Sequence, residues 1–178
     1  MVNRGKQFEA VIRTAMEKVP EISVDRIHDQ TTGFRGSKNI CDFIVYRWPY
    51  QYYIECKSVH GSSLSFSNIT ETQWKGLLQK SRIPGVFAGV ICWWIDKDVT
   101  KFIPIQILDD LKRNHNYKSY RYDYSHWNGI QKTIEIKGKK KRVFFDYDMK
   151  GFFNDLRQSK NRTSERHTVA RRKQQQDD

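Results

Sequence analysis

The sequence predicts an α/β domain in which helices flank a mixed central β-sheet. Three observations predict this class. The N-terminus has apolar residues at helical spacing, two short runs rich in β-branched and aromatic residues follow around residues 42–57, and Val86–Trp94 is apolar for a strand's length. Helix-type and strand-type patterns alternate along the chain, as is typical of layered α/β domains.

The first helix is predicted over residues 3–18, and Pro20 helps to end it. Its apolar residues recur every three or four positions: Phe8, Val11, Ile12, Ala15, Met16 and Val19. A strand is expected at Ile22–Ile27. Residues 28–39 are polar and contain two glycines, which predicts a mobile loop.

A β-hairpin is predicted next, with strands at 42–47 and 51–57 and a turn around Trp48-Pro49. A Ser/Gly-rich connection, 58–69, leads to Thr70-Glu-Thr-Gln73. This is a capping-box pattern that predicts a helix to about Lys80. Val86–Trp94 then predicts a central strand buried on both faces.

The last part of the chain gives weaker patterns. A strand is expected at Lys101–Ile105 and a helix at Ile105–His115, whereas residues 116–129 fit no pattern. Ile130–Ile136 and Val143–Tyr147 are predicted to pair across a basic turn, 137–142. A short helix around Phe152, Phe153 and Leu156 would close a folded domain of residues 1–156, and residues 157–178 would form a basic, disordered tail.

Composition limits the protein class. The 178 residues suit one domain, and no apolar run is long enough to span a membrane. The N-terminus lacks the apolar stretch of a signal peptide, and the three cysteines have no metal-binding spacing. We therefore expect a cytoplasmic protein without a membrane partner, whose cysteines are reduced packing residues.

The charge is strongly positive, at +12, and much of it is clustered. Lys137–Arg142 carries five positive charges, and the tail 157–178 carries seven Lys and Arg against three acids. Such clusters attract polyanions and favour nucleic acid as the partner, although a solubilising surface explains the charge as well. The expected DNA contacts in the first cluster are Lys139, Lys140, Lys141 and Arg142.

The predicted hairpin gathers chemically active side chains on one face. A turn centred between residues 48 and 49 places Asp42 directly across from Glu55, and Lys57 shares the face of Glu55. Two opposed acids repel each other unless a cation lies between them, and carboxylate oxygens suit Mg²⁺ or Mn²⁺. The alternative interpretation is an ordinary solvated sheet face.

Further residues complete a candidate metal-dependent phosphodiesterase site. The backbone carbonyl of Cys56 is a candidate third ligand, and Lys57 is suited to orient a water or to stabilise developing negative charge. Glu9 lies beside the apolar stripe of the first helix, where it could approach the acids or be simply exposed. Gln73 is fully explained by capping, yet it is also suitably placed to help at the site.

These residues resemble those of RecU-type Holliday junction resolvases, members of the PD-(D/E)xK nuclease superfamily. Asp42, twelve intervening residues and Glu55-Cys-Lys57 resemble the superfamily signature. The resemblance covers roughly residues 3–95. Residues that flank the signature also match: Asn3-Arg4-Gly5, Glu9, Asn39, Ser58, Phe66-Ser-Asn68 and Gln73.

The resemblance implies a restriction-endonuclease-like core and a homodimer that cuts two strands of a four-way DNA junction with Mg²⁺. It implies that Glu9, Asp42 and Glu55 are metal-site acids and that Lys57 is the catalytic lysine. It further implies that Gln73 assists catalysis and that Arg4 contacts DNA.

One departure from the family is the segment between the first helix and Asp42. RecU proteins carry a long stalk-like insertion there, whereas this chain has only residues 20–41. The loop 28–39 would be a reduced counterpart, with Arg35 and Lys38 as phosphate contacts. A shortened resolvase would suit a phage or prophage origin.

The sequence thus predicts a Mg²⁺-dependent, structure-selective endodeoxyribonuclease that resolves Holliday junctions in DNA recombination and repair. Two alternatives stay open. One is a restriction- or repair-type endonuclease on the same fold, which would cut according to base sequence or damage. The other is a DNA-binding module without catalysis, which would bind with steep salt dependence and never hydrolyse DNA.

Overall fold

A six-stranded mixed sheet forms the centre of the computed structural model, which describes residues 3–27, 39–124 and 132–159. The strand order is β1-β2-β3-β5-β6-β8. β3 and β5 run parallel, and every other neighbouring pair in this sheet is antiparallel. The strands are β1 (Ser23–Arg26), β2 (Phe43–Arg47), β3 (Tyr50–Val59), β5 (Val86–Trp94), β6 (Val99–Pro104) and β8 (Ile134–Glu135).

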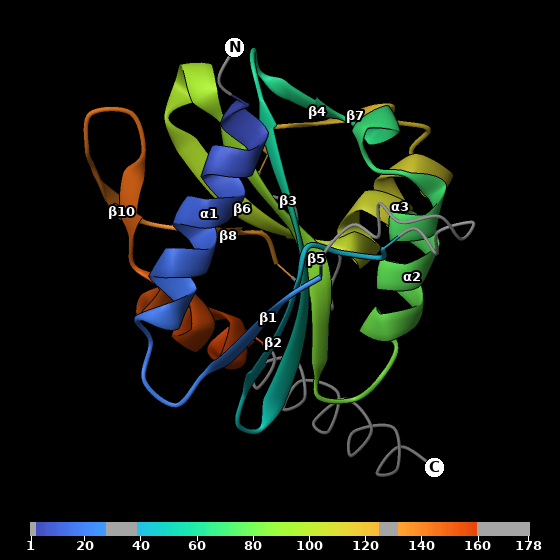
Figure 1. Cartoon of the computed structure of the whole chain (residues 1–178). Coiled ribbons are helices and arrows are strands. Elements are labelled where there is room, and N and C mark those ends of the chain that lie inside the picture. The colour runs from blue at the N-terminus through green and yellow to red at the C-terminus, as the bar shows by residue number, and fades with distance from the viewer. Residues whose placement is uncertain (1–2, 28–38, 125–131, 160–178) are drawn as a thin grey trace, which may run out of the picture.

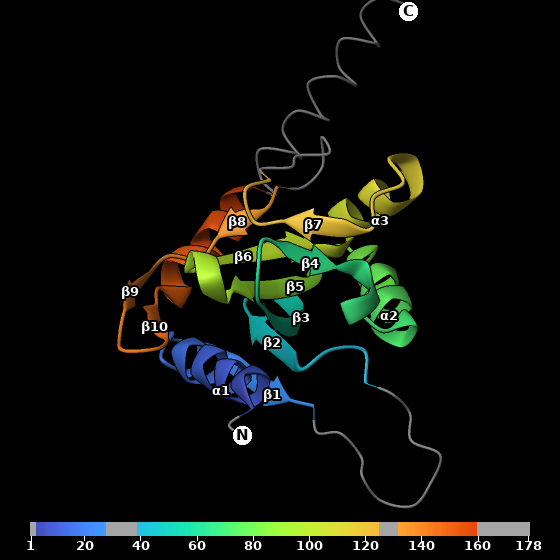
Figure 2. The same cartoon turned by 90° about the horizontal axis from the view of Figure 1, so that it is seen from above.

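Helices cover both faces of this sheet, as Figures 1 and 2 show from two directions. Helix α1 (Arg4–Glu17) and a helix at residues 149–159 lie on one face, and α2 (Glu71–Ser81) and α3 (Ile105–Asn114) lie on the other. Each face has its own apolar core, one containing Phe8 and Phe43 and the other Leu77 and Leu108. The predicted class, a mixed sheet flanked by helices, is confirmed.

The β2–β3 hairpin has the predicted register. Phe43 pairs with Ile54, and Arg47 pairs with Tyr50 across the turn. The side chains of Phe43, Ile54 and Cys56 are buried in the core on the α1 face. Since side chains alternate along a strand, Asp42, Glu55 and Lys57 belong to the other face, toward α2.

Strand β5 lies inside the sheet, between β3 and β6, and all nine of its residues are buried. Gly89 lies in this strand because nothing larger fits. A Cβ atom there would lie 2.4 Å from the carbonyl oxygen of Ile103 in β6. The continuous apolar run therefore reflects burial on both faces, as predicted.

Side-chain caps set the starts of two helices, of which only the capping box of α2 was predicted. The side chain of Asn3 accepts a hydrogen bond from the Lys6 amide and caps α1. Helix α2 begins with a complete capping box: the Thr70 hydroxyl accepts from the Gln73 amide, and the Gln73 side chain accepts from the Thr70 amide.

Two small sheets were not predicted. In the Ser/Gly-rich connection, β4 (Ser63–Ser65) pairs with β7 (Ser119–Arg121), which lies in the segment that fitted no pattern. The short 3-10 helices η1 (Phe66–Asn68) and η2 (Ile95–Lys97) follow β4 and β5. Tyr120 is fully buried in β7, so tertiary packing rather than local pattern stabilises this strand.

The predicted pairing of Ile130–Ile136 with Val143–Tyr147 is wrong. Residues Ile134–Glu135 form β8 on the edge of the main sheet, where Ile134 pairs with Phe102. Phe145–Tyr147 forms β10, which pairs instead with β9 (Gly138–Lys140) inside the expected basic turn. All of β9 is exposed, so it carries no alternation of apolar and polar residues that could predict a strand.

The C-terminal helix continues to residue 159, three residues beyond the predicted boundary at 156. The rest of the proposed tail, 160–178, lies outside the described residues, as do 28–38 and 125–131. All three cysteines are free and buried. No helix among the described residues is long and apolar enough to cross a membrane.

Candidate active site

Backbone hydrogen bonds hold Asp42, which precedes β2, between β3 and the end of β1. Its amide donates to the carbonyl of Ile54 at 3.1 Å, and its carbonyl accepts from the amide of Ile27 at 2.8 Å. The side-chain Oδ2 accepts a 2.7 Å hydrogen bond from the amide of Cys56. The carboxylate of Asp42 is thereby held against β3, next to Glu55.

Glu55 is the most deeply buried acid of the site, with 2% of its surface exposed. Its Oε1 accepts from the Gln73 amide nitrogen Nε2 at 2.6 Å and lies 2.7 Å from the Lys57 ammonium. Its Oε2 is buried without a hydrogen-bond partner in the described protein. A buried carboxylate oxygen in this state is costly unless something else binds it.

Burial raises the proton affinity of both acids. Burial raises the pKa of Glu55 above its ordinary range, and the charge of Asp42 raises it further. Burial also raises the pKa of Asp42, although the hydrogen bond from the Cys56 amide opposes the shift. One lysine is insufficient to compensate both carboxylates, so the pair retains a proton or binds a further cation.

Cys56 contributes its backbone rather than its thiol. The side chain is buried on the α1 face, and burial raises the pKa of its thiol well above the ordinary value. The amide and carbonyl of one residue point toward the same edge of a strand. Since the Cys56 amide reaches Asp42, its carbonyl faces the same edge and suits the predicted role as a third oxygen ligand.

Gln73 makes a contact that fits each of the two roles the sequence left open. Its Oε1 completes the capping box of α2, and its Nε2 donates to Glu55. The first turn of α2 is thus attached to the site by the same side chain that starts the helix. The hydrogen bond from Gln73 is made to Oε1 of Glu55, so it holds this carboxylate in place without using Oε2.

Glu9 is brought near the acids but faces a different partner. Its carboxylate forms an ion pair with Arg26 of β1 at 3.0 Å. Its charge nonetheless contributes to the raised pKa of Asp42. Direct ligation of a metal by Glu9 stays a prediction, because here the carboxylate is paired with arginine.

Arg26 is a site residue that sequence reasoning missed. It pairs with Phe43 in the β1–β2 ladder, one position from Asp42, and it neutralises Glu9. The strand was predicted, but its register against β2 was not. That register would have indicated which side of β1 approaches the acids.

The donor set suits a magnesium ion. Magnesium is usually held by one or two carboxylates, with water and substrate phosphate completing its octahedral shell. Asp42, the orphaned Oε2 of Glu55 and the Cys56 carbonyl match that pattern. Within the described ranges, no three His, Cys, Asp or Glu side chains converge as a ready-made metal cage.

The predicted DNA contacts are spread over several elements. Arg4 is exposed at the first position of α1. In the β9–β10 hairpin, Lys140 is paired with Asp98, and Lys141 lies 4.0 Å from Asp146. Lys139 and Arg142 are exposed there as well, whereas Arg35 and Lys38 lie outside the described residues.

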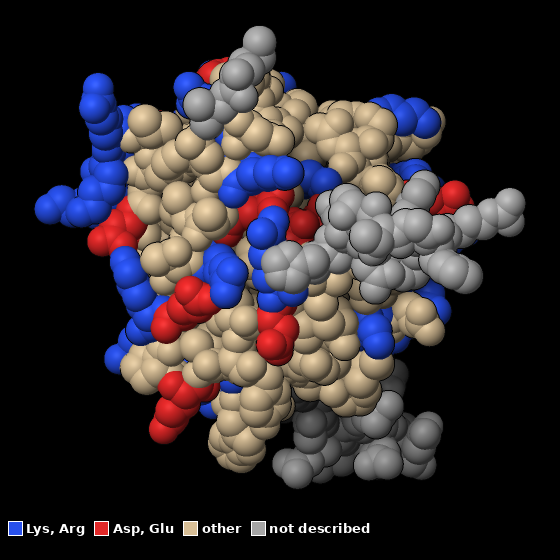
Figure 3. Space-filling model, in the orientation of Figure 1, with Lys and Arg blue, Asp and Glu red and all other residues tan. Residues whose placement is uncertain are grey.

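The surface charge agrees with a site that combines acids and cations. On the face seen in Figure 3, acidic side chains lie near the middle of the view with Lys and Arg side chains directly around them. The Lys and Arg side chains of such a surface favour the approach of a polyanion.

Comparisons with known proteins give a limited likeness. No protein-family model matches the chain, and no curated protein sequence matches it. The chain is similar in structure to Archaeoglobus fulgidus Hjc, a Holliday junction resolvase from an archaeal hyperthermophile, with 19% identity and a TM-score of 0.44. The match covers 58% of this chain and 78% of that one. At these values, the geometry of the site remains the basis for assigning a function.

Proposed function

We propose that this chain is a Mg²⁺-dependent endodeoxyribonuclease that acts on branched DNA. The observation that carries the proposal is the buried Asp42–Glu55 pair, in which Oε2 of Glu55 accepts no hydrogen bond from the described residues. A passive DNA-binding surface has no need for opposed acids in its interior. A hydrolase that recruits a divalent cation to a phosphodiester does.

Asp42, Glu55 and the Cys56 carbonyl would hold the metal, with Mn²⁺ as a substitute and Glu9 as a further acid. The bound ion would activate water and neutralise charge on the phosphate. The Cys56 amide positions Asp42, and Gln73 positions Glu55. The ammonium of Lys57, 2.7 Å from Glu55, is suited to hold the attacking water or stabilise the negative charge that develops on the phosphate.

The preferred substrate would be a four-way junction, and the active form a cytoplasmic homodimer. The resemblance of Asp42, Glu55-Cys-Lys57 and the N-terminal Asn3-Arg4-Gly5 to RecU-type resolvases supports this assignment, together with a restriction-endonuclease-like core. Two copies would supply one active site for each of two strands, as paired cleavage requires. A role in recombination and repair follows from that substrate.

The test is cleavage of a synthetic four-way junction and of a linear duplex of the same sequence, each with Mg²⁺ and with EDTA. We expect junction cleavage only with the metal. The Asp42→Asn variant should bind the junction but fail to cut it, because phosphate contacts come from basic side chains. Asp25→Asn, an acid-to-amide change on the exposed neighbouring strand, is the matched control and should cut normally.

The outcomes separate the alternatives. Equal cutting of junction and duplex would remove the resolvase assignment but keep the nuclease. Cutting that follows base sequence or damage would indicate a restriction- or repair-type enzyme. Cleavage by Asp42→Asn at the wild-type rate would remove the proposed site, and salt-dependent binding without any hydrolysis would indicate a DNA-binding module.

A further inference from the structure

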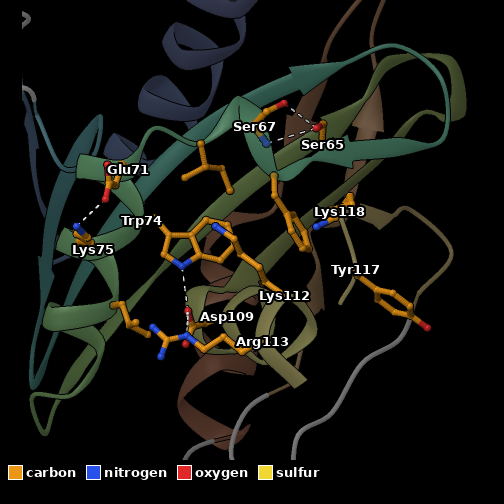
Figure 4. Close-up of a pocket in the computed structure, with 13 residues that line it drawn as sticks. Ser65, Ser67, Glu71, Trp74, Lys75, Asp109, Lys112, Arg113, Tyr117 and Lys118 are labelled. Atoms are coloured by element: carbon orange, nitrogen blue, oxygen red, sulfur yellow. Dashed lines mark hydrogen bonds and ion pairs between the residues drawn. The ribbon is translucent and has the colours of Figure 1, made fainter. Parts of the chain in front are cut away.

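A cavity lies on the α2–α3 face of the molecule, and neither acid of the Asp42–Glu55 pair lines it. Its volume is about 770 Å³. Figure 4 shows that its walls come from α2, α3, η1 and the segment that precedes β7. Nothing in the proposed hydrolysis uses it.

The floor of this cavity is apolar and aromatic. Phe66 and Trp74 pack edge to face, with ring centroids 5.4 Å apart, and both are largely buried. Ile69 and Leu78 extend the floor. Tyr117, 42% exposed, lies at the edge and offers an accessible aromatic ring. A flat, apolar ligand fits such a surface.

The acids of the cavity are already compensated. Glu71 lies 2.6 Å from the Lys75 ammonium. Asp109 accepts from the Trp74 indole and from Arg113, each at 3.0 Å. Neither carboxylate therefore presents an unbalanced negative charge to a ligand.

Two further cations face the cavity from different walls. The Lys112 ammonium lies over the Trp74 ring, 4.4 Å from its centroid. Lys118 is exposed on the wall opposite Glu71 and Lys75 in Figure 4. With the acids balanced by Lys75 and Arg113, these two lysines give the cavity a positive excess that suits an anionic group.

The cavity and the acid pair lie on two sides of one helix end. Gln73, in the first turn of α2, reaches Glu55. Glu71 and Trp74, its neighbours in the same turn, line the cavity. The first turn of α2 therefore connects the acid pair with the cavity.

We propose that this cavity binds an unpaired nucleotide of the DNA strand beside the cleavage site, with the base against the exposed ring of Tyr117 at the edge of the apolar floor and its phosphate between Lys112 and Lys118. The inference rests on the proposed nuclease function. The faces of a base inside a duplex are covered by its stacked neighbours, so only an unstacked, single-stranded or branch-point nucleotide can lay its base against this surface. A second copy of this +12 chain is a poorer occupant, because two basic surfaces repel.

The experiment measures binding of fluorescent oligo-dT and of a duplex of equal length in EDTA, so that cleavage plays no part. In Lys112→Glu/Lys118→Glu, affinity for oligo-dT should fall about tenfold more than affinity for duplex. Lys132→Glu/Lys150→Glu makes the same charge change at exposed positions outside the cavity and should weaken both ligands equally. All four lysines are exposed, so both variants should fold.

Photocrosslinking locates the nucleotide directly. Oligo-dT that carries 5-iododeoxyuridine should crosslink to Tyr117, the exposed aromatic of the cavity, and Tyr117→Ala should remove the adduct. Equal losses for oligo-dT and duplex, or crosslinks only elsewhere, would overturn the proposal. So would a change in sedimentation caused by Lys112→Glu/Lys118→Glu, which would assign the cavity to a second copy. Asp42→Asn tests the nuclease separately, because oligo-dT binding should persist in that variant.

Discussion

The hairpin buries the carboxyl groups of Asp42 and Glu55, and this burial determines how readily they bind protons. Burial raises the pKa of both carboxyl groups, so the folded chain without metal binds protons that the unfolded chain releases. A raised carboxyl pKa makes stability fall as the pH rises through the interval between the unfolded and folded values. The acid pair is thus a source of instability that a divalent cation would relieve.

Without metal, the melting temperature should fall as the pH rises from about 4 toward and beyond neutrality. Asp42→Asn should flatten this decline, because it removes one charge while the amide oxygen of the new side chain still accepts from the Cys56 amide. Thermal melts in EDTA across this range measure the effect. An unchanged slope in Asp42→Asn would contradict the coupling, and Asp25→Asn serves as the control.

Gln73 has two separable contacts. Gln73→Ala should reduce cleavage by about 10- to 100-fold, the usual range when a residue that orients a metal ligand is lost. Thr70→Ala disturbs only the cap and should cost about 1 kcal/mol of unfolding free energy with cleavage largely kept. Steady-state cleavage and urea melts of both variants test this. If Gln73→Ala and Thr70→Ala lose cleavage activity equally, Gln73 acts only as a helix cap.

At the scale of single residues, the sequence predicted the neighbours that follow from the register of one hairpin. Asp42, Glu55 and Lys57 came together because alternation and turn position leave one arrangement. The ion pair of Glu9 with Arg26 was out of reach, because it depends on how two separate elements dock. The bond from Gln73 to Glu55 likewise depends on the docking of α2 against β3.

At the scale of elements, prediction succeeded where the signal is contained in the segment itself. The burial of β5 and the capping box of α2 are both contained in contiguous residues. β4, β7 and β9 are three residues long and owe their conformation to partners elsewhere. The basic residues of β9 looked like a turn because an exposed strand has no apolar face.

Gly89 gives an element-scale prediction. Gly89→Ala would force a methyl group against the Ile103 carbonyl, which is sheet backbone and cannot rotate away. We expect a loss of about 1–3 kcal/mol in unfolding free energy, the range for overpacked cores. The control is Gly5→Ala in α1, where the nearest atom is 3.3 Å from the new carbon. Chemical denaturation measures both, and a neutral Gly89→Ala would contradict the close approach of β5 and β6.

For the whole molecule, charge governs the encounter with DNA. The segment 160–178 supplies six of the Lys and Arg residues. Its deletion should weaken binding to junction and duplex by a similar factor and lower the salt dependence of both, because it removes phosphate-neutralising charge. Titrations at several salt concentrations measure this. A loss confined to the junction would show instead that the tail recognises branching.

The parallel pairing of β3 with β5 has a consequence for how the protein becomes active. Such a pair needs a crossover, and α2 is that crossover, so Asp42, Glu55, Lys57 and Gln73 all belong to one uninterrupted stretch that ends with β5 at Trp94. Short separations along the chain favour early assembly. These four residues of the proposed site can therefore come together through contacts made within residues 42–94 alone.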